Sequence, residues 1–143
     1  MNYLYDILEN ESNEKAFHIY ALVALKMTKK VYDRLPEKIQ QIADDAKVYW
    51  AHNEDCLVTR KQMDYHASVI SKLRFNSSNK YEMNDNIELK VVELCLIISN
   101  DTDMFDYHLD WMYEVGKIIG YSNQKLDQLI DDTIKEYNRN NYE

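Results

Sequence analysis

The scarcity of glycine and proline most constrains what this chain can fold into. Its 143 residues include two Gly and one Pro, far below the usual roughly 7% and 5%. Sheets need tight turns, and such turns depend on Gly, Pro or Asn-Gly pairs. Hydrophobic residues make up 45% of the chain, enough for a proper core at this length. We therefore predict an all-α fold, organised as a single helical domain over residues 1–143.

Apolar residues recur at helical spacing along most of the chain. Pro36 ends one predicted helix and suits the first turn of the next, Gly120 can stop another in the left-handed conformation, and Ser122 can cap the last. A run of β-branched residues leaves a strand as the alternative for residues 86–99. The pattern predicts a compact bundle or short stack of six to seven helices, over residues 2–9, 14–34, 37–53, 54–73, 86–99, 101–119 and 123–137.

Charge is distributed unevenly along the chain. Residues 1–35 hold five acids and five bases, and residues 36–75 hold six of each. Residues 76–143 hold fourteen acids and six bases, so the whole formal charge of −8 lies in this half. An acidic chain lacks the basic footprint that nucleic acid requires, so we expect no direct nucleic-acid binding.

The stretch from residue 100 to residue 116 combines acids with aromatic residues and contains no Lys or Arg. On a helix its acids share one face, where like charges repel by a few tenths of a kcal/mol per pair. A basic partner would relieve that repulsion, and aromatic rings would supply buried contact energy. This pattern predicts a partner-binding site, with a plain solvated face as the alternative, at Asp103, Asp106, Tyr107, Asp110, Tyr113 and Glu114.

The opposite side of the same helix is expected to face the core. Its apolar stripe comprises Met104, His108, Trp111, Val115 and Ile118/Ile119. Another aromatic residue, Trp50, ends the helix that follows Pro36. We interpret it as a cap on the core, although a second polar-aromatic corner of a binding surface is the alternative.

Catalytic and metal-binding patterns are weak in this sequence. His52 and Cys56 are four residues apart, as zinc ligands can be, but no second pair with ligand spacing lies near them. Acids at 88, 93, 127, 131 and 132 do not form paired metal-binding motifs, and no Gly-rich phosphate loop is present. We therefore predict no catalytic residues, no metal and no cofactor. Lys26, Lys29 and Lys30 are interpreted as part of a solvated face.

The two cysteines and the hydropathy pattern bear on location. Cys56 and Cys95 are far apart and have apolar neighbours, which favours buried free thiols in a reducing compartment. The longest apolar run, residues 94–98, is far shorter than the roughly 20 residues of a membrane span. The mixed composition of the first residues leads us to expect no signal peptide. These features predict a cytoplasmic protein with no membrane partner.

The layout of residues 14–75 resembles the small all-helical immunity proteins of bacterial polymorphic and contact-dependent growth-inhibition toxin systems. One helix closes on residues 33–36, DRLP; the next carries residues 42–46, IADDA, and ends in residues 49–51, YWA; the third passes through Leu57, Arg60, Ala67 and Ile70. Related helical proteins are usually richer in Ala and often have Gly after the Trp, where this chain has Ala51. That departure leaves the subfamily and the cognate toxin open.

The resemblance implies a non-enzymatic protein that binds one toxin domain and blocks it. Many such toxins are basic nucleases, which would complement the acidic half of this chain. Two other functions remain open. One is an acidic phage or plasmid inhibitor that imitates nucleic acid, and the other is a metal-dependent all-α nucleotide hydrolase. The oligomeric state is also open.

Overall fold

In the computed structural model, helices pack around one central helix. The structure describes residues 13–51, 58–75, 87–97 and 105–140. Those residues contain no strand, and their elements are α2 (Asn13–Val31), η1 (Tyr32–Arg34), α3 (Glu37–Trp50), α4 (Arg60–Phe75), α5 (Ile87–Leu94), α6 (Phe105–Ile118) and α7 (Asn123–Asn140). The all-α prediction of six to seven helices is confirmed. The helix expected over residues 2–9 lies outside the described residues.

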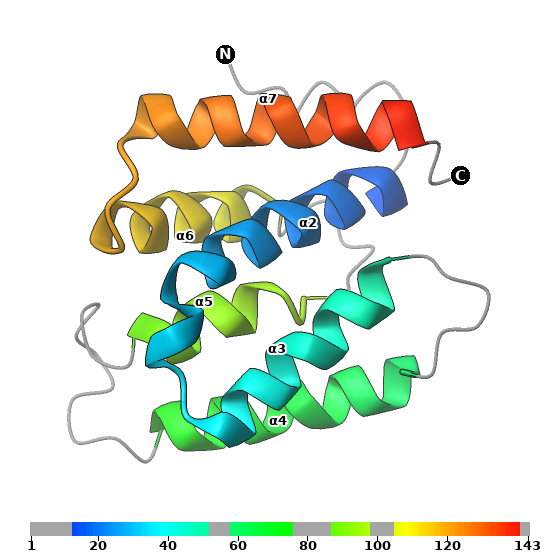
Figure 1. The fold of residues 1–143 in the computed structure, drawn as a ribbon, viewed down its shortest axis with the longest axis vertical. Helices are drawn as coiled ribbons and strands as arrows, with labels where there is room; N and C mark the ends of the chain where they lie inside the picture. The colour runs from blue at the N-terminus through cyan, green and yellow to red at the C-terminus, as the bar shows by residue number, and fades with distance from the viewer. Residues whose placement is uncertain (1–12, 52–57, 76–86, 98–104, 141–143) are drawn as a thin grey trace.

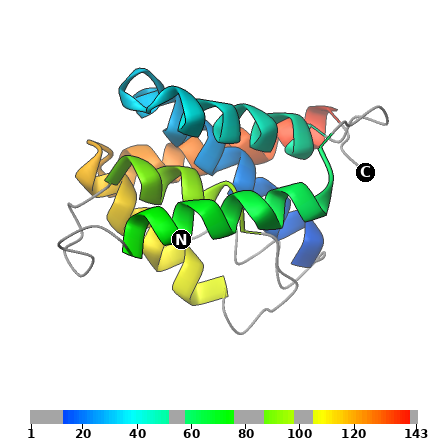
Figure 2. The same cartoon turned by 90° about the horizontal axis from the view of Figure 1, so that it is seen from below.

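Helix α2 is the centre of the arrangement. It packs against α3, α5, α6 and α7, and Figures 1 and 2 show it lying among these helices. The residues that recur at helical spacing along this segment are all buried: Phe17, Tyr20, Ala21, Ala24, Met27, Thr28 and Val31. Because neighbours cover most of the circumference of α2, burial extends beyond one stripe, as expected for a helix inside a core; it also includes Ala16, His18, Ile19 and Val23.

Local sequence signals set several helix ends as expected. The η1 turn tightens the end of α2, and Pro36 stands at the N-cap of α3. Gly120 adopts a φ of 108°, a left-handed conformation that glycine takes without strain. The Ser122 hydroxyl accepts a hydrogen bond from the Lys125 backbone N–H at 3.1 Å and so caps α7.

Helix α4 begins later than predicted, and helix α5 ends earlier than predicted. Helix α4 starts at Arg60, not near residue 54, because Thr59 and Gln62 form a capping box. The Gln62 N–H donates to the Thr59 hydroxyl at 3.2 Å, and the Thr59 N–H donates to the Gln62 side chain at 2.7 Å. Helix α5 ends at Leu94, where tight backbone bonds from Cys95 and residue 96 close it.

A polar network inside the core joins the ends of three elements. The His18 Nε2–H donates to the Trp50 carbonyl at 2.7 Å, and the Trp50 indole N–H donates to the Cys95 carbonyl at 2.7 Å. The Cys95 thiol lies 3.1 Å from the hydroxyl of Thr28, which donates to the Ala24 carbonyl. Trp50 is 6% exposed. Its interpretation as part of the core is confirmed; the polar residues that follow it in the alternative binding corner lie outside the described residues.

Candidate functional site

Three carboxylates form an exposed row along α6. Asp106, Asp110 and Glu114 are all exposed, and they succeed one another at intervals of four residues. At 1.5 Å of rise per residue, the row extends over roughly 12 Å of helix. Exposed Tyr107, with 60% of its surface accessible, lies beside the row. We call these four residues the acidic face of α6.

Two further residues were predicted for this site, and the structure describes one of them. Asp103 lies outside the described residues. Tyr113 is only half exposed, and its hydroxyl donates a hydrogen bond to the Asp127 carboxylate of α7. Tyr113 therefore helps to hold α6 against α7, whereas the ring of Tyr107 is accessible on the surface.

The buried side of α6 differs from the predicted stripe. The predicted positions His108, Trp111, Ile118 and Ile119 are only half buried, and of that stripe Val115 alone is fully covered among the described residues. The residues that face the core are Phe105, Leu109, Met112, Val115 and Gly116. The reason is tertiary: the Phe105 ring packs edge-on against Phe17, with ring centres 5.1 Å apart. With this large ring packed beside α2, α6 is rotated about its axis by roughly one residue position relative to the predicted orientation.

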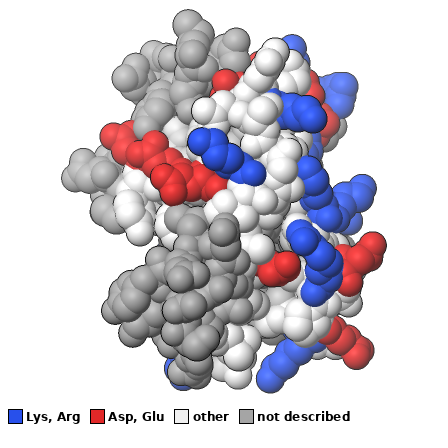
Figure 3. Space-filling view, turned by 90° about the vertical axis from the view of Figure 1, so that its left-hand side faces the viewer, with Lys and Arg blue, Asp and Glu red and all other residues white. Residues whose placement is uncertain are grey.

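The acidic face carries charge that the described part of the chain does not neutralise. Ion pairs among those residues join Lys26 to Glu136, Arg34 to Glu88, His66 to Asp45 and Lys135 to Asp131. None of them involves Asp106, Asp110 or Glu114. Lys117 lies about one turn beyond Glu114 but forms no ion pair with it. Figure 3 shows one group of carboxylates at the upper left of the view, while Lys and Arg lie mainly on the right, together with further carboxylates.

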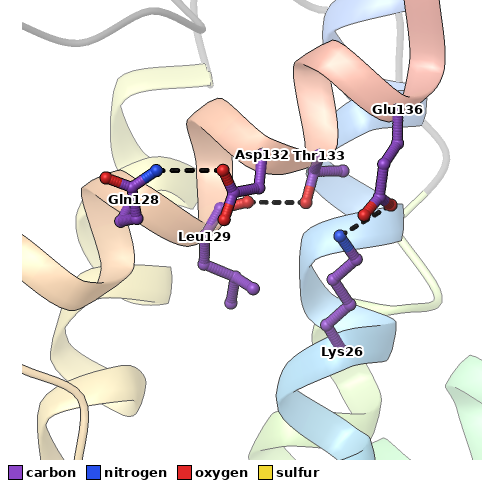
Figure 4. Close-up of polar contacts among 6 residues, drawn as sticks. All are labelled: Lys26, Gln128, Leu129, Asp132, Thr133 and Glu136. Atoms are coloured by element: carbon purple, nitrogen blue, oxygen red, sulfur yellow. Dashed lines mark hydrogen bonds and ion pairs between the residues drawn. The ribbon is translucent and has the colours of Figure 1, made fainter. Parts of the chain in front are cut away.

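The carboxylates considered for a metal site have other partners. Asp127 accepts the Tyr113 hydroxyl, Asp131 pairs with Lys135 at 3.0 Å, and Asp132 accepts the Gln128 amide at 2.9 Å. Figure 4 shows Asp132 held in this way along α7. Across the described ranges, no group of three or more His, Cys, Asp or Glu side chains is placed to hold a metal ion. The His52–Cys56 pair lies outside those ranges.

Cys95 is a buried free thiol. Burial raises the pKa of this thiol to about 12, although the hydrogen bond with Thr28 lowers it in part. Because the thiolate is the nucleophile, a thiol with so high a pKa is unreactive near neutral pH. The prediction of a buried free thiol is confirmed for Cys95, whereas Cys56 lies outside the described residues.

Cys95 is therefore expected to resist alkylation in the folded protein. In a Cys56→Ser variant, iodoacetamide at pH 8 should leave Cys95 unmodified under native conditions and modify it fully in urea, with mass spectrometry as the readout. Complete modification of the native protein within minutes would show that Cys95 is neither buried nor protonated as described.

A groove that the sequence analysis missed lies on another side of the molecule. Helices α3 and α7 each pack on α2, and a hollow of about 670 Å³ lies where the three helices meet. Its lining combines apolar side chains with charged ones: Leu22, Leu25, Lys26, Thr28, Lys29, Tyr32, Asp33, Ala43, Asp44, Lys47, Ala51, Thr133, Glu136 and Tyr137. Lys29 and Lys30 are exposed, as predicted for a solvated face, and Lys26 is half buried. Helical spacing does not reveal that α3 and α7 stand on either side of this face.

Part of the groove wall is held by internal polar contacts. The Lys26 ammonium pairs with Glu136 at 2.9 Å, joining α2 to α7 (Figure 4). The Tyr32 hydroxyl donates to the two carboxylate oxygens of Asp44, at 3.0 and 3.1 Å. That hydrogen bond is the main cause that raises the pKa of Tyr32 above its ordinary value. These contacts occupy two of the three carboxylates that line the groove.

Three comparisons with known proteins find no match. No family model, no curated protein and no solved structure matches the chain. Within the described residues, no helix is long and apolar enough to cross a membrane. The charge and exposure of the protein's own surface are therefore what point to a function.

Proposed function

We propose that this protein captures a basic protein partner on the acidic face of α6 and neutralises it, as an immunity protein neutralises its toxin. The observation that carries the proposal is the row of Asp106, Asp110 and Glu114, exposed and without ion-pair partners among the described residues, beside exposed Tyr107. Binding of Lys or Arg side chains would relieve the repulsion within this row. An aromatic ring at such a site supplies contact area at little entropic cost.

The rigid setting of the face supports recognition of one defined partner. The core residues of α6 are packed against α2, α5 and α7, and Tyr113 bonds to α7. The carboxylates are therefore presented on a fixed helix, which lowers the entropy lost on binding. A basic nuclease domain is the partner that we propose, with the protein acting in the cytoplasm by binding and not by catalysis.

Capture from cells of the source organism tests this proposal. The tagged protein should retain one stoichiometric basic protein at low salt, and co-expression with that protein's toxic domain should restore growth. An Asp106→Asn, Asp110→Asn, Glu114→Gln variant should lose this protection. Its matched control neutralises three acids elsewhere, Asp33→Asn, Asp64→Asn and Asp132→Asn, and should still protect.

Two results would contradict the proposal. One is protection that persists undiminished in the α6 variant, and the other is the absence of any retained basic protein. If the retained protein binds nucleic acid and loses that activity without being toxic, the acidic inhibitor that imitates nucleic acid becomes the better description.

A further inference from the structure

Helix α4 presents a basic row with exposed apolar side chains to solvent. Lys61, Tyr65 and Lys72 recur at helical spacing on its outer side and are all exposed, Tyr65 with 68% of its surface accessible. Leu73, which is 43% exposed, lies beside this row. The helix packs on α3 and α5 through its other side, where Met63 is fully buried. We call Lys61, Tyr65, Lys72 and Leu73 the basic strip of α4.

The strip is basic although the chain as a whole is acidic. Among the described residues, the charged side chains that α4 exposes are Arg60, Lys61, Asp64 and Lys72, and none of them forms an ion pair with another described residue. Asp64 lies on the flank of the helix, where Arg60, four residues before it, balances its charge. Asp45 of α3 is bonded to His66 at 2.8 Å. The outward row of α4 therefore holds two ammonium groups and no carboxylate.

The acidic face of α6 complements this strip in charge and in length. The carboxylates of that face extend over roughly 12 Å of helix, and Lys61 and Lys72 are separated by roughly 16 Å along α4. Each surface also carries an exposed tyrosine, Tyr65 on α4 and Tyr107 on α6. Within one molecule, α5 packs against both helices and lies between them (Figure 1). Because no ion pair among the described residues joins the two surfaces, each is available to a second molecule.

We propose that the basic strip of α4 binds the acidic face of α6 in a second copy of this chain. Charge pairing sets the register of this contact, and Tyr65 and Leu73 supply apolar area. Exposed ion pairs contribute little individually, and a contact between two helix faces is small beside the roughly 800 Å² per partner of a stable interface. The association is therefore weak, with a Kd of about 0.1–1 mM.

The net charge of −8 on each copy does not prevent this contact. At physiological ionic strength the Debye length is about 8 Å, so the charges that meet at the contact outweigh those on the rest of the surface. The association does not depend on the capture of a basic protein. If both occur, the second copy and the basic protein compete for the same face of α6.

Two charge-reversed variants test the contact with the purified chain alone. Lys61→Glu, Lys72→Glu makes the α4 strip acidic, and Asp110→Lys, Glu114→Lys makes the α6 face basic. By sedimentation equilibrium at up to about 1 mM protein, each variant alone should self-associate at least about tenfold more weakly than the wild type, because its two surfaces then carry charge of the same sign. Mixed in equal amounts, the two variants should associate with each other, because each surface of one meets the opposite charge on the other.

Net charge does not account for that pattern. With two units per substitution, the formal charge changes from −8 to −12 in the α4 variant and to −4 in the α6 variant. Both variants remain negative, so attraction between them must come from local charges. If repulsion between whole molecules decided the association, the α6 variant would self-associate more strongly than the wild type.

Matched controls make the same changes of charge at exposed positions away from both surfaces. They are Lys29→Glu, Lys125→Glu for the α4 variant and Asp33→Lys, Asp132→Lys for the α6 variant. Each control should self-associate as the wild type does, within about twofold. Urea unfolding curves confirm that every variant is folded.

Three outcomes would overturn the proposal. The first is a wild-type protein that stays monomeric up to about 1 mM at physiological ionic strength. The second is a mixture of the two charge-reversed variants that associates no more than either variant alone. The third is an equal loss of self-association in the variants and in their matched controls. None of these outcomes bears on the capture of a basic protein, which is measured with that protein present.

Discussion

The double charge reversal Asp106→Lys, Asp110→Lys is expected to weaken binding of the proposed basic partner by about 100-fold or more. Each reversal removes an attraction and adds a repulsion, and close charge pairs across interfaces contribute about 1.5 kcal/mol or more. Two such losses correspond to a change in Kd of roughly two orders of magnitude. Isothermal titration of the purified complex at low and at high salt measures the change, which should shrink as salt screens the charges.

The same substitutions should leave the fold intact. Both side chains are exposed and neither forms an ion pair with a described residue, so the free energy of unfolding should change by less than about 1 kcal/mol. The loss of a favourable acid from the first turn of α6 is offset by relief of repulsion along the helix. The matched control is Asp64→Lys, Asp132→Lys, which has the same net charge. Equal affinity in the two double variants would remove the α6 face from the binding site.

Trp50→Ala is expected to lower the free energy of unfolding by about 3–5 kcal/mol, the usual range for truncating a buried aromatic side chain. The substitution empties a space among His18, Tyr49 and the core. It also leaves the Cys95 carbonyl without the indole donor that lies 2.7 Å away. Equilibrium urea unfolding measures the loss, which should appear as a lower midpoint with an unchanged slope.

A graded series separates the packing of Trp50 from its hydrogen bond. Trp50→Phe keeps most of the apolar ring but removes the donor, so a loss of about 1–3 kcal/mol is expected. Tyr65→Ala is the control, because Tyr65 is 68% exposed and its truncation should change stability by less than about 0.5 kcal/mol. A loss in Trp50→Ala no larger than that of the control would contradict the burial of Trp50.

Helix positions were largely predictable because their signals are local. The scarcity of Gly and Pro, the 3.6-residue periodicity, Pro36, Gly120 and Ser122 all act within a few residues of where they stand. The capping box of Thr59 and Gln62 was also readable, as a Thr followed three residues later by Gln. This motif indicates a helix start at Arg60, where α4 begins, and not near residue 54.

The candidate site was predictable in part. Spacing alone places Asp106, Asp110 and Glu114 on one face, and the structure leaves all three exposed. Spacing does not show that Tyr113 reaches Asp127, because the two residues lie on different helices. Nor does it show that Lys90 is buried, at 3% exposed, because that depends on how many neighbours cover α5.

The sequence by itself determined the helical class, several helix ends and the gathering of acids in the C-terminal half, because these follow from short-range backbone preferences and from composition. Only the tertiary structure decided how far α6 is turned about its axis and that α3 and α7 meet over α2 in a groove. Both depend on contacts between residues far apart in the chain, such as Phe17 with Phe105 and Lys26 with Glu136. Periodicity fixes a face of each helix but does not choose its neighbour.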